Sequence, residues 1–266
     1  HRPGGMFGGV PRTRPSRPPA LAQYEFHKEL GHGSAGRVFL VRERDTGAHV
    51  VIKQVPLDDI CDPSTVLQEV HLLSALSSPY VVRCHDAWVE GGELQIAMEH
   101  VPSGTLAARL RRQRGRYLSE RTVWRYFCQV LLGLDHMHTA HRVVHRDLKA
   151  LNIMLDARDT CKIVDLGVAR RLTEKSPLAR TGVGTPYYLS PELCQGSPYG
   201  EGSDIWALGC LLYEVASLRP PFEATNQAAL VLKILEGRTD PLPPVYTPDV
   251  GAVVQRCLAG EPSERP

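Results

Sequence analysis

The sequence predicts an α+β chain with two lobes, a small β-rich lobe followed by a larger helical lobe. Between residues 24 and 101, β-branched apolar runs alternate with turn signals, a pattern typical of strands. From residue 104 onward, apolar residues recur at helical spacing. The short link VPSGT at 101–105 divides the two patterns. A ligand cleft is expected where two such lobes meet.

The small lobe, residues 23–101, is predicted to contain a sheet and one main helix. VFLVRER at 38–44 and AHVVIKQV at 48–55 are strand-like runs on either side of the turn signal DTG. STVLQEVHLLSAL at 64–76 has the apolar spacing of a helix. LQIAME at 94–99 is predicted to be a buried strand.

The large lobe, residues 102–266, is predicted to be mainly helical. The strongest helical patterns cover 121–140 and 204–218. The second contains a long apolar run, but Glu214 interrupts it. No apolar run reaches the roughly 18–20 residues that cross a membrane. We therefore predict a core helix at 204–218 and no membrane association.

Composition limits the classes of function. The 266 residues are 42% apolar and carry a net charge of +2, so they can form a full core and give no argument for a nucleic acid partner. The seven cysteines are scattered without a CxxC pair, which disfavours a metal or disulfide framework and indicates a reducing, cytoplasmic compartment. Residues 1–22 are rich in proline, glycine and arginine and hold no acid. They are predicted to be a flexible basic leader, in preference to a transit peptide.

The first candidate site is a glycine motif. Gly31, Gly33 and Gly36, with Val38 after them, fit the pattern G-x-G-x-x-G. The motif lies between two strand-like runs, which argues against a dinucleotide-binding turn, because that turn leads into a helix. It suits a hairpin whose backbone N–H groups approach phosphates without obstruction by Cβ atoms. Glycines of this kind also occur in ordinary hairpins.

Charged residues follow at informative spacings. Lys53 ends an apolar strand, and Glu69 lies sixteen residues later on the predicted helix. An ion pair between them would aim the ammonium at anionic oxygens, although a lysine at a strand end often only reaches solvent. Further along, Asn152 and Asp165 supply two hard oxygen donors of the kind that Mg²⁺ prefers. Asp147 precedes them within VVHRDLKALNIML at 143–155.

Taken together, these motifs resemble the protein kinases over about residues 24–265. The motifs are the glycine loop, VVIK, HRDLKALN, DLG, SPE at 190–192 and DIWALG at 204–209. The resemblance implies a bilobal protein kinase fold that ends before the last helices of the large lobe. It also implies ATP and Mg²⁺ as cofactors and the activity of a non-specific serine/threonine protein kinase.

The resemblance also implies a role for each matched residue. Asp147 would accept the proton of the attacking hydroxyl, and Asn152 and Asp165 would hold Mg²⁺. Lys53, oriented by Glu69, would contact the α- and β-phosphates. Lys149 matches the serine/threonine-specific branch. Residues placed around the nucleotide are Leu30, Gly31, Gly33, Gly36, Val38, Val51, Lys53, Met98, Glu99, Val101 and Met154. For the apolar ones, plain core packing predicts the same residue types.

The segment 184–226 is similar to the NIMA-related (NEK) kinases. That similarity implies activation by a phosphate on Thr181, received by Arg146 and Arg170, although Thr181 could also be an ordinary solvated loop residue. Protein substrates with serine or threonine, and roles at microtubules, centrosomes or cilia, follow from the same similarity. Two scaffold contacts are also expected. Glu192 would pair with Arg265, and Asp204 would bind the backbone of the catalytic loop.

Two departures from the family pattern, at Ala35 and Cys84, keep another function open. Ala35 stands where this family has an aromatic residue, and Cys84 is small for a core stack that includes Leu73, Leu166 and His145. A pseudokinase-type scaffold that binds nucleotide or partners without phosphotransfer is therefore the alternative function.

The arginine run RLRRQRGR at 109–116 is predicted either to bind acidic partners or, more often for such runs, to form a solvated helix face.

Overall fold

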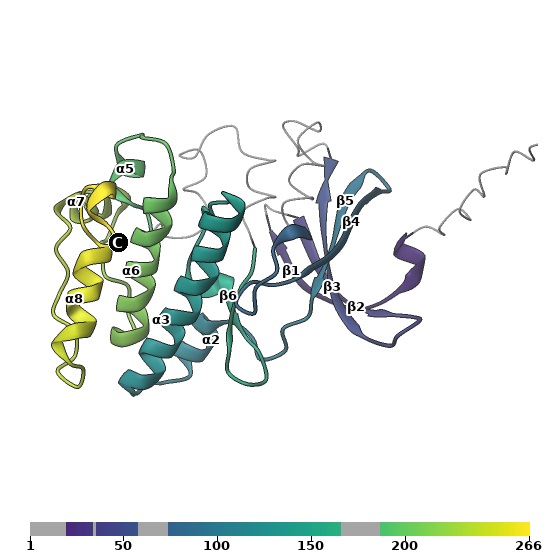
Figure 1. The fold of residues 1–266 in the computed structure, drawn as a ribbon, viewed down its shortest axis with the longest axis horizontal. Coiled ribbons are helices and arrows are strands. Elements are labelled where there is room, and N and C mark those ends of the chain that lie inside the picture. Colours follow the sequence, from purple (N-terminus) through teal and green to yellow (C-terminus); the bar gives the residue numbers. More distant parts are fainter. Residues whose placement is uncertain (1–19, 34–35, 58–73, 166–186) are drawn as a thin grey trace, which may run out of the picture.

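A computed structural model describes residues 20–33, 36–57, 74–165 and 187–266. The chain forms a small lobe built on one antiparallel sheet and a larger lobe built on helices, which lie side by side (Figure 1). The predicted α+β, bilobal fold class is confirmed. The predicted helix at 64–76 lies almost entirely outside the described residues.

The sheet of the small lobe has five antiparallel strands in the order β1-β2-β3-β5-β4. A short 3-10 helix, η1, precedes it. The bounds are η1 Ala20–Gln23, β1 Tyr24–Gly33, β2 Gly36–Glu43, β3 His49–Pro56, β4 Cys84–Glu90 and β5 Glu93–Glu99. The predicted runs at 38–44, 48–55 and 94–99 therefore form strands.

The two faces of the sheet bury different clusters, as the alternation of side chains along a strand requires. One face carries Val41, Val50, Ile52 and Ala97, a small cluster of its own. The other face, with Ile96 and others, joins the large core of the molecule. Ile96 and Ala97 are consecutive residues of β5 and thus face opposite sides of the sheet. The side that carries Ile96 packs against the large lobe.

Gly36 shows why the glycine motif is tightly constrained. Its φ of +104° lies where residues with a side chain are strained, and a Cβ atom at this position would lie 2.0 Å from the carbonyl oxygen of Gln54. Close packing of β2 on β3 therefore requires glycine here, independently of any phosphate.

The large lobe consists of helices around a short two-stranded sheet. In chain order its helices are α2 Leu106–Arg111, α3 Glu120–Asp135, the π-helix η4 His136–Ala140, the 3-10 helix η5 Ala150–Asn152, α5 Pro191–Cys194, α6 Glu201–Ser217, α7 Gln227–Glu236, α8 Pro248–Cys257 and the 3-10 helix η6 Pro262–Glu264. The two strands are β6 Ile153–Leu155 and β7 Cys161–Ile163. Hydroxyl groups cap the first two helices, since Thr105 accepts from the Ala108 N–H at 3.2 Å and Ser119 from the Thr122 N–H at 3.3 Å.

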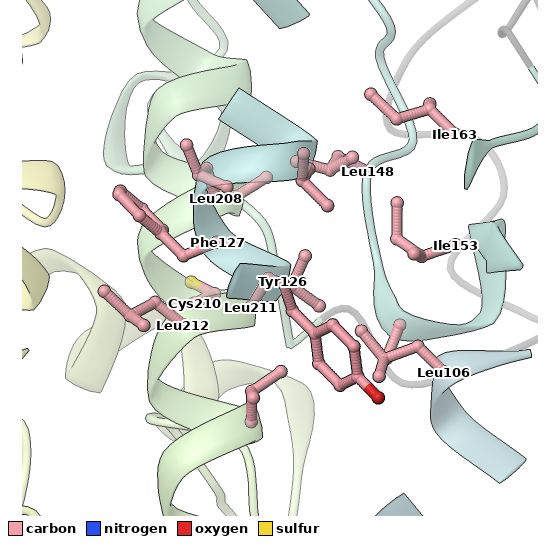
Figure 2. Packing of buried hydrophobic residues seen from close by; sticks show 14 of the residues in the cluster. Leu106, Tyr126, Phe127, Leu148, Ile153, Ile163, Leu208, Cys210, Leu211 and Leu212 are labelled. Atoms are coloured by element: carbon pink, nitrogen blue, oxygen red, sulfur yellow. The ribbon is translucent and has the colours of Figure 1, made fainter. Parts of the chain in front are cut away.

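The core of the large lobe lies between α3 and α6. Figure 2 shows Phe127 of α3 beside Leu208 and Leu212 of α6 and the ring of Tyr126 beside Leu106 of α2. Ile153 and Ile163 approach from the β6–β7 hairpin. Nearly every residue of α6 is buried, which agrees with the core helix predicted at 204–218. Among the residues that the structure describes, no helix has both the length and the apolar character to cross a membrane.

The predicted helix at 121–140 changes its winding near its end. It is α-helical as far as Asp135 and continues as the π-helix η4. Such wider turns are frequent near functional sites. Here the π-helix contains His138, whose Nε2 lies 2.8 Å from Oδ2 of Asp204. Apolar periodicity alone does not reveal this local change, because it depends on a contact with a distant residue.

Candidate active site

The loop at residues 143–152 follows η4, ends in η5 and leads into β6. β6 pairs with β7, and the N–H of Val164 donates to the carbonyl oxygen of Asn152 at 2.9 Å. Asp165 follows directly after Val164. The hairpin therefore brings Asn152 and Asp165 close together although the sequence separates them.

Two polar side chains of the loop converge on the carboxylate of Asp147. Lys149 Nζ lies 2.7 Å from Oδ2 of Asp147. The amide of Asn152 donates to the same oxygen at 2.9 Å and to the backbone carbonyl of Asp147 at 2.8 Å. The Asp147 side chain is 28% exposed, so it remains accessible to a reacting group. The structure thus brings together the three residues that the sequence singled out at 143–155.

Lys53 forms an ion pair with Asp165. The lysine lies on β3 and is 8% exposed, and its ammonium joins the sheet of the small lobe to the segment that follows β7. Burial acts to raise the pKa of Asp165, but the Lys53 ammonium overcomes this effect and holds the pKa below its usual value. The carboxylate is therefore ionised at neutral pH.

The donor atoms at this point fit a Mg²⁺ ion. Within the described residues, Oδ1 of Asn152 and Oδ2 of Asp165 accept no hydrogen bond, while the other polar atom of each side chain is engaged. Two oxygens of this kind, completed by phosphate and water, suit the preferences of Mg²⁺.

Asp204 holds the backbone of this loop in place. It is completely buried and accepts from the backbone N–H groups of His145 at 2.7 Å and Arg146 at 3.1 Å. His138 and the hydroxyl of Tyr199 complete its shell. Burial acts to raise the pKa of Asp204, but the hydrogen bonds, that of His138 foremost, hold the pKa below its usual value. The contact predicted between Asp204 and the loop backbone is present.

Arg146 has a strained backbone conformation in this loop. Its φ of +70° is left-handed, a region that residues with a side chain rarely adopt. The hydrogen bond from its N–H to Asp204 stabilises that backbone. His145 is held too, because its Nδ1 accepts from the N–H of Asp147 at 3.2 Å and its Nε2 lies 3.1 Å from the carbonyl oxygen of Val164.

Residues predicted to surround the nucleotide lie on the facing elements of the two lobes. Val51 of β3 pairs with Met98 of β5, and Val38 of β2 pairs with Lys53. Met154 of β6 is bridged to Thr105, the last residue of the link between the lobes. The side chains of Val38, Val51, Met98 and Met154 are each half-buried, whereas Val101 is buried and Leu30 is exposed.

Two contacts near the site have no counterpart in the sequence predictions. Lys162 Nζ lies 3.0 Å from Oε2 of Glu99, which ties β7 to the end of β5. The hydroxyl of Tyr188 donates to the half-buried Glu214 and accepts from the N–H of Ala150 at 3.3 Å. Burial raises the pKa values of both Tyr188 and Glu214, and the nearby Glu214 charge adds to the effect at Tyr188. No sequence motif indicated either pair.

Several predicted residues lie outside the described part of the chain. They are Ala35, Glu69, Leu73, Leu166, Arg170 and Thr181. The Lys53–Glu69 ion pair and the Thr181 pocket therefore stay predictions. Of the predicted core stack, Cys84 and His145 are described, and both are buried.

Glu192 and Arg265 form the predicted scaffold pair. The guanidinium donates to both carboxylate oxygens, at 2.8 and 2.9 Å. Its remaining donors reach the carbonyl oxygens of Gly202, Ala259 and Gly260, so all five N–H groups are used. Burial acts against the charge of Glu192, but the Arg265 hydrogen bonds outweigh it and lower the pKa of Glu192 to about 2.

Comparison with known proteins shows which family the chain belongs to. Residues 24–266 match the family model described as "Protein kinase domain". The chain is 43% identical to "Serine/threonine-protein kinase Nek8" of Danio rerio, over 92% of this chain and 35% of that protein. It is 40% identical to "Serine/threonine-protein kinase Nek5" of Mus musculus, over 91% of this chain and 38% of that protein. It thus spans between a third and two fifths of the length of these relatives.

Proposed function

We propose that this chain, which belongs to the protein kinase family, transfers the γ-phosphoryl group of ATP to serine or threonine hydroxyls of protein substrates. Its resemblance to the NIMA-related kinases is confirmed by relatives that are all named as Nek serine/threonine kinases. The observation that carries the proposal is the convergence of Lys149 and Asn152 on Asp147, beside the Lys53–Asp165 ion pair.

Asp147 is proposed to orient the attacking hydroxyl and to accept its proton. Its carboxylate is held at Oδ2 by Lys149 and Asn152, and its backbone N–H by His145. A general base must lie within hydrogen-bond reach of the proton it accepts, and these contacts support the proposal by fixing the position of the carboxylate. The Lys149 ammonium brings positive charge to the place where the phosphoryl group would be transferred, which favours an anionic transition state.

Lys53 is proposed to bind phosphate oxygens of ATP, with the N–H groups around Gly31, Gly33 and Gly36 covering them. Asn152 and Asp165 are the residues that would hold Mg²⁺, which when bound neutralises charge on the triphosphate. The apolar side chains of Leu30, Val38, Val51, Met98, Val101 and Met154 are proposed to enclose the adenine, with the backbone of Glu99–Val101 pairing with its edge.

Phosphorylation of Thr181 is proposed to activate the enzyme, with Arg146 and Arg170 receiving the phosphate. Thr181→Ala is then expected to lower activity strongly and to leave nucleotide binding near normal. Equal activity of the variant and the fully phosphorylated wild type would rule this regulation out. Protein partners at microtubules, centrosomes or cilia and a cytoplasmic location are proposed on the family resemblance alone.

The function is tested with radiolabelled ATP, Mg²⁺ and matched peptides that differ only in carrying serine, threonine or tyrosine. We expect transfer to serine and threonine, little transfer to tyrosine, and none when the metal is removed with a chelator. Binding of ATP without transfer to any peptide, by protein phosphorylated on Thr181, would favour the pseudokinase-type scaffold instead.

A further inference from the structure

The segment between Glu99 and Glu120 concentrates positive charge. It contains five arginines and no acid, although the whole chain has a net charge of only +2. Arg109 is half-buried and hydrogen-bonds to Tyr126. The other four are exposed and form what we call the arginine face: Arg111, Arg112, Arg114 and Arg116. The face begins at the end of α2, the first helix after the link between the lobes.

The acids in the described part of the chain do not neutralise the arginine face. Within the described residues, no ion pair involves any of its four arginines. Glu120, the next acid in the chain, binds Trp124 and Thr247. Asp159 binds Arg125 and Tyr126. The charge of the face is therefore left to solvent or to a partner.

The helix dipole explains only part of this arrangement. A cation in the last turn is favourable at the negative end of a helix, which accounts for Arg111 and for Arg112 at the cap. Arg114 and Arg116 lie beyond the helix, on either side of Gly115. Arg114 has a φ of +50° and Gly115 of +82°, so a tight left-handed turn follows the helix. A simple solvated helix face does not require these two additional charges.

An apolar contact point borders the arginine face. Tyr117 is 46% exposed, and its ring packs edge-on against Tyr246 at 6.4 Å between centroids. Tyr246 is itself fixed, because its hydroxyl donates to the carbonyl oxygen of Leu118 at 2.9 Å. Its neighbour Val245 is 60% exposed. A held aromatic ring beside unpaired arginines is typical of protein-binding surfaces, where tyrosine and arginine are enriched.

We propose that the arginine face binds an acidic segment of a partner protein, with Tyr117 contacting an apolar side chain of that segment. Carboxylates complement the four guanidinium groups in charge and in geometry. A protein is favoured over nucleic acid because the chain has a pI of only 8.2, below the range typical of nucleic-acid-binding domains. The surface is separate from the residues of the proposed phosphotransfer, so its binding can be tested whether or not the chain is an active kinase.

The test uses the whole chain and a fluorescein-labelled, glutamate-rich peptide with a central phenylalanine, followed by fluorescence anisotropy. The double variant Arg111→Gln/Arg116→Gln is compared with Arg238→Gln/Arg256→Gln. The control pair is also exposed, removes the same charge and, in Arg256, also includes an arginine in the last turn of a helix. We expect the first variant to bind about three- to tenfold more weakly, given the usual strength of exposed ion pairs, and the control to bind like the wild type.

Two further measurements sharpen the result. Binding should weaken as salt is added, and less steeply in the double variant, because fewer charges are screened. Tyr117→Ser should weaken binding of the phenylalanine peptide and leave a phenylalanine-free peptide unaffected. If the control variant lost as much peptide affinity as the first variant, the loss would reflect net charge in general, and the proposal would be overturned. Tighter binding of oligothymidine than of the peptide would assign the face to nucleic acid instead.

Discussion

Two aspartates hold the same loop and differ in almost every physical respect. Asp204 is completely buried and has four polar partners, two of them backbone N–H groups of the loop. Asp147 is 28% exposed and is held by the side chains of Lys149 and Asn152. A buried acid with a full shell fixes structure. An acid whose side chain remains accessible can take part in chemistry, and mutation should separate these roles.

The largest effect on stability is expected at Asp204. Asp204→Ala leaves the N–H groups of His145 and Arg146 and the ring of His138 without their acceptor inside the protein. Because hydrogen bonds to buried charges are strong and costly to leave unmade, the free energy of unfolding should fall by about 4–5 kcal/mol. Urea denaturation measures this loss. Asp45→Ala, at an exposed turn, serves as the control, and a loss at Asp204 no larger than at Asp45 would contradict the structural role.

A somewhat smaller effect is expected at the Glu192–Arg265 pair. Arg265→Met leaves a buried carboxylate without its partner and should cost about 3–4 kcal/mol at neutral pH. The wild type should also lose stability in acid. The pKa of Glu192 is lowered from 4.5 to about 2, so the contribution of the pair is present above pH 4.5 and is lost as the pH falls toward 2.

Denaturation curves at several pH values test this sign directly. Between pH 4.5 and 2 the stability of the wild type should fall more steeply than that of Arg265→Met, since the variant lacks the partner that lowers the pKa. Parallel pH profiles for the two proteins would show that the pair does not control acid stability.

The smallest effect is expected at Glu99 and Lys162. The ion pair is partly exposed, so Lys162→Met should change the free energy of unfolding by less than about 1 kcal/mol. Because the pair joins β7 of the large lobe to the end of β5 in the small lobe, ATP affinity is the more sensitive measurement. A double-mutant cycle with Glu99→Gln should give a coupling of a few tenths of a kcal/mol in ATP binding. A coupling as large as that of a buried pair would show that this contact controls the site.

The fold class and the centre of the site could be predicted because their signals are local. Asp147, Lys149 and Asn152 lie within six residues, and the loop that carries them is short. The apolar periods of α6 and the strands predicted the elements that support this loop. The Glu192–Arg265 pair was also predicted, but only by resemblance, since 73 residues separate the two.

The remaining contacts depend on which distant surfaces meet. Lys53 contacts Asp165 across 112 residues, and Tyr188 meets Glu214 across 26, without any repeating pattern that could reveal either pair. The glycine motif gives a related lesson. It was interpreted as a phosphate-binding feature, yet Gly36 is already required by its approach to Gln54. One residue type can therefore satisfy packing and ligand binding at once.

The most direct test of the account measures phosphate transfer, ATP affinity and the free energy of unfolding on the same preparation of Asp147→Asn. The account predicts a fall in transfer of about 10²–10⁴-fold, the usual contribution of a general base, with ATP affinity and stability close to those of the wild type. Transfer at the wild-type rate would contradict the role of Asp147 as the base. A loss of stability as large as that of Asp204→Ala would show that the two aspartates do not differ as proposed.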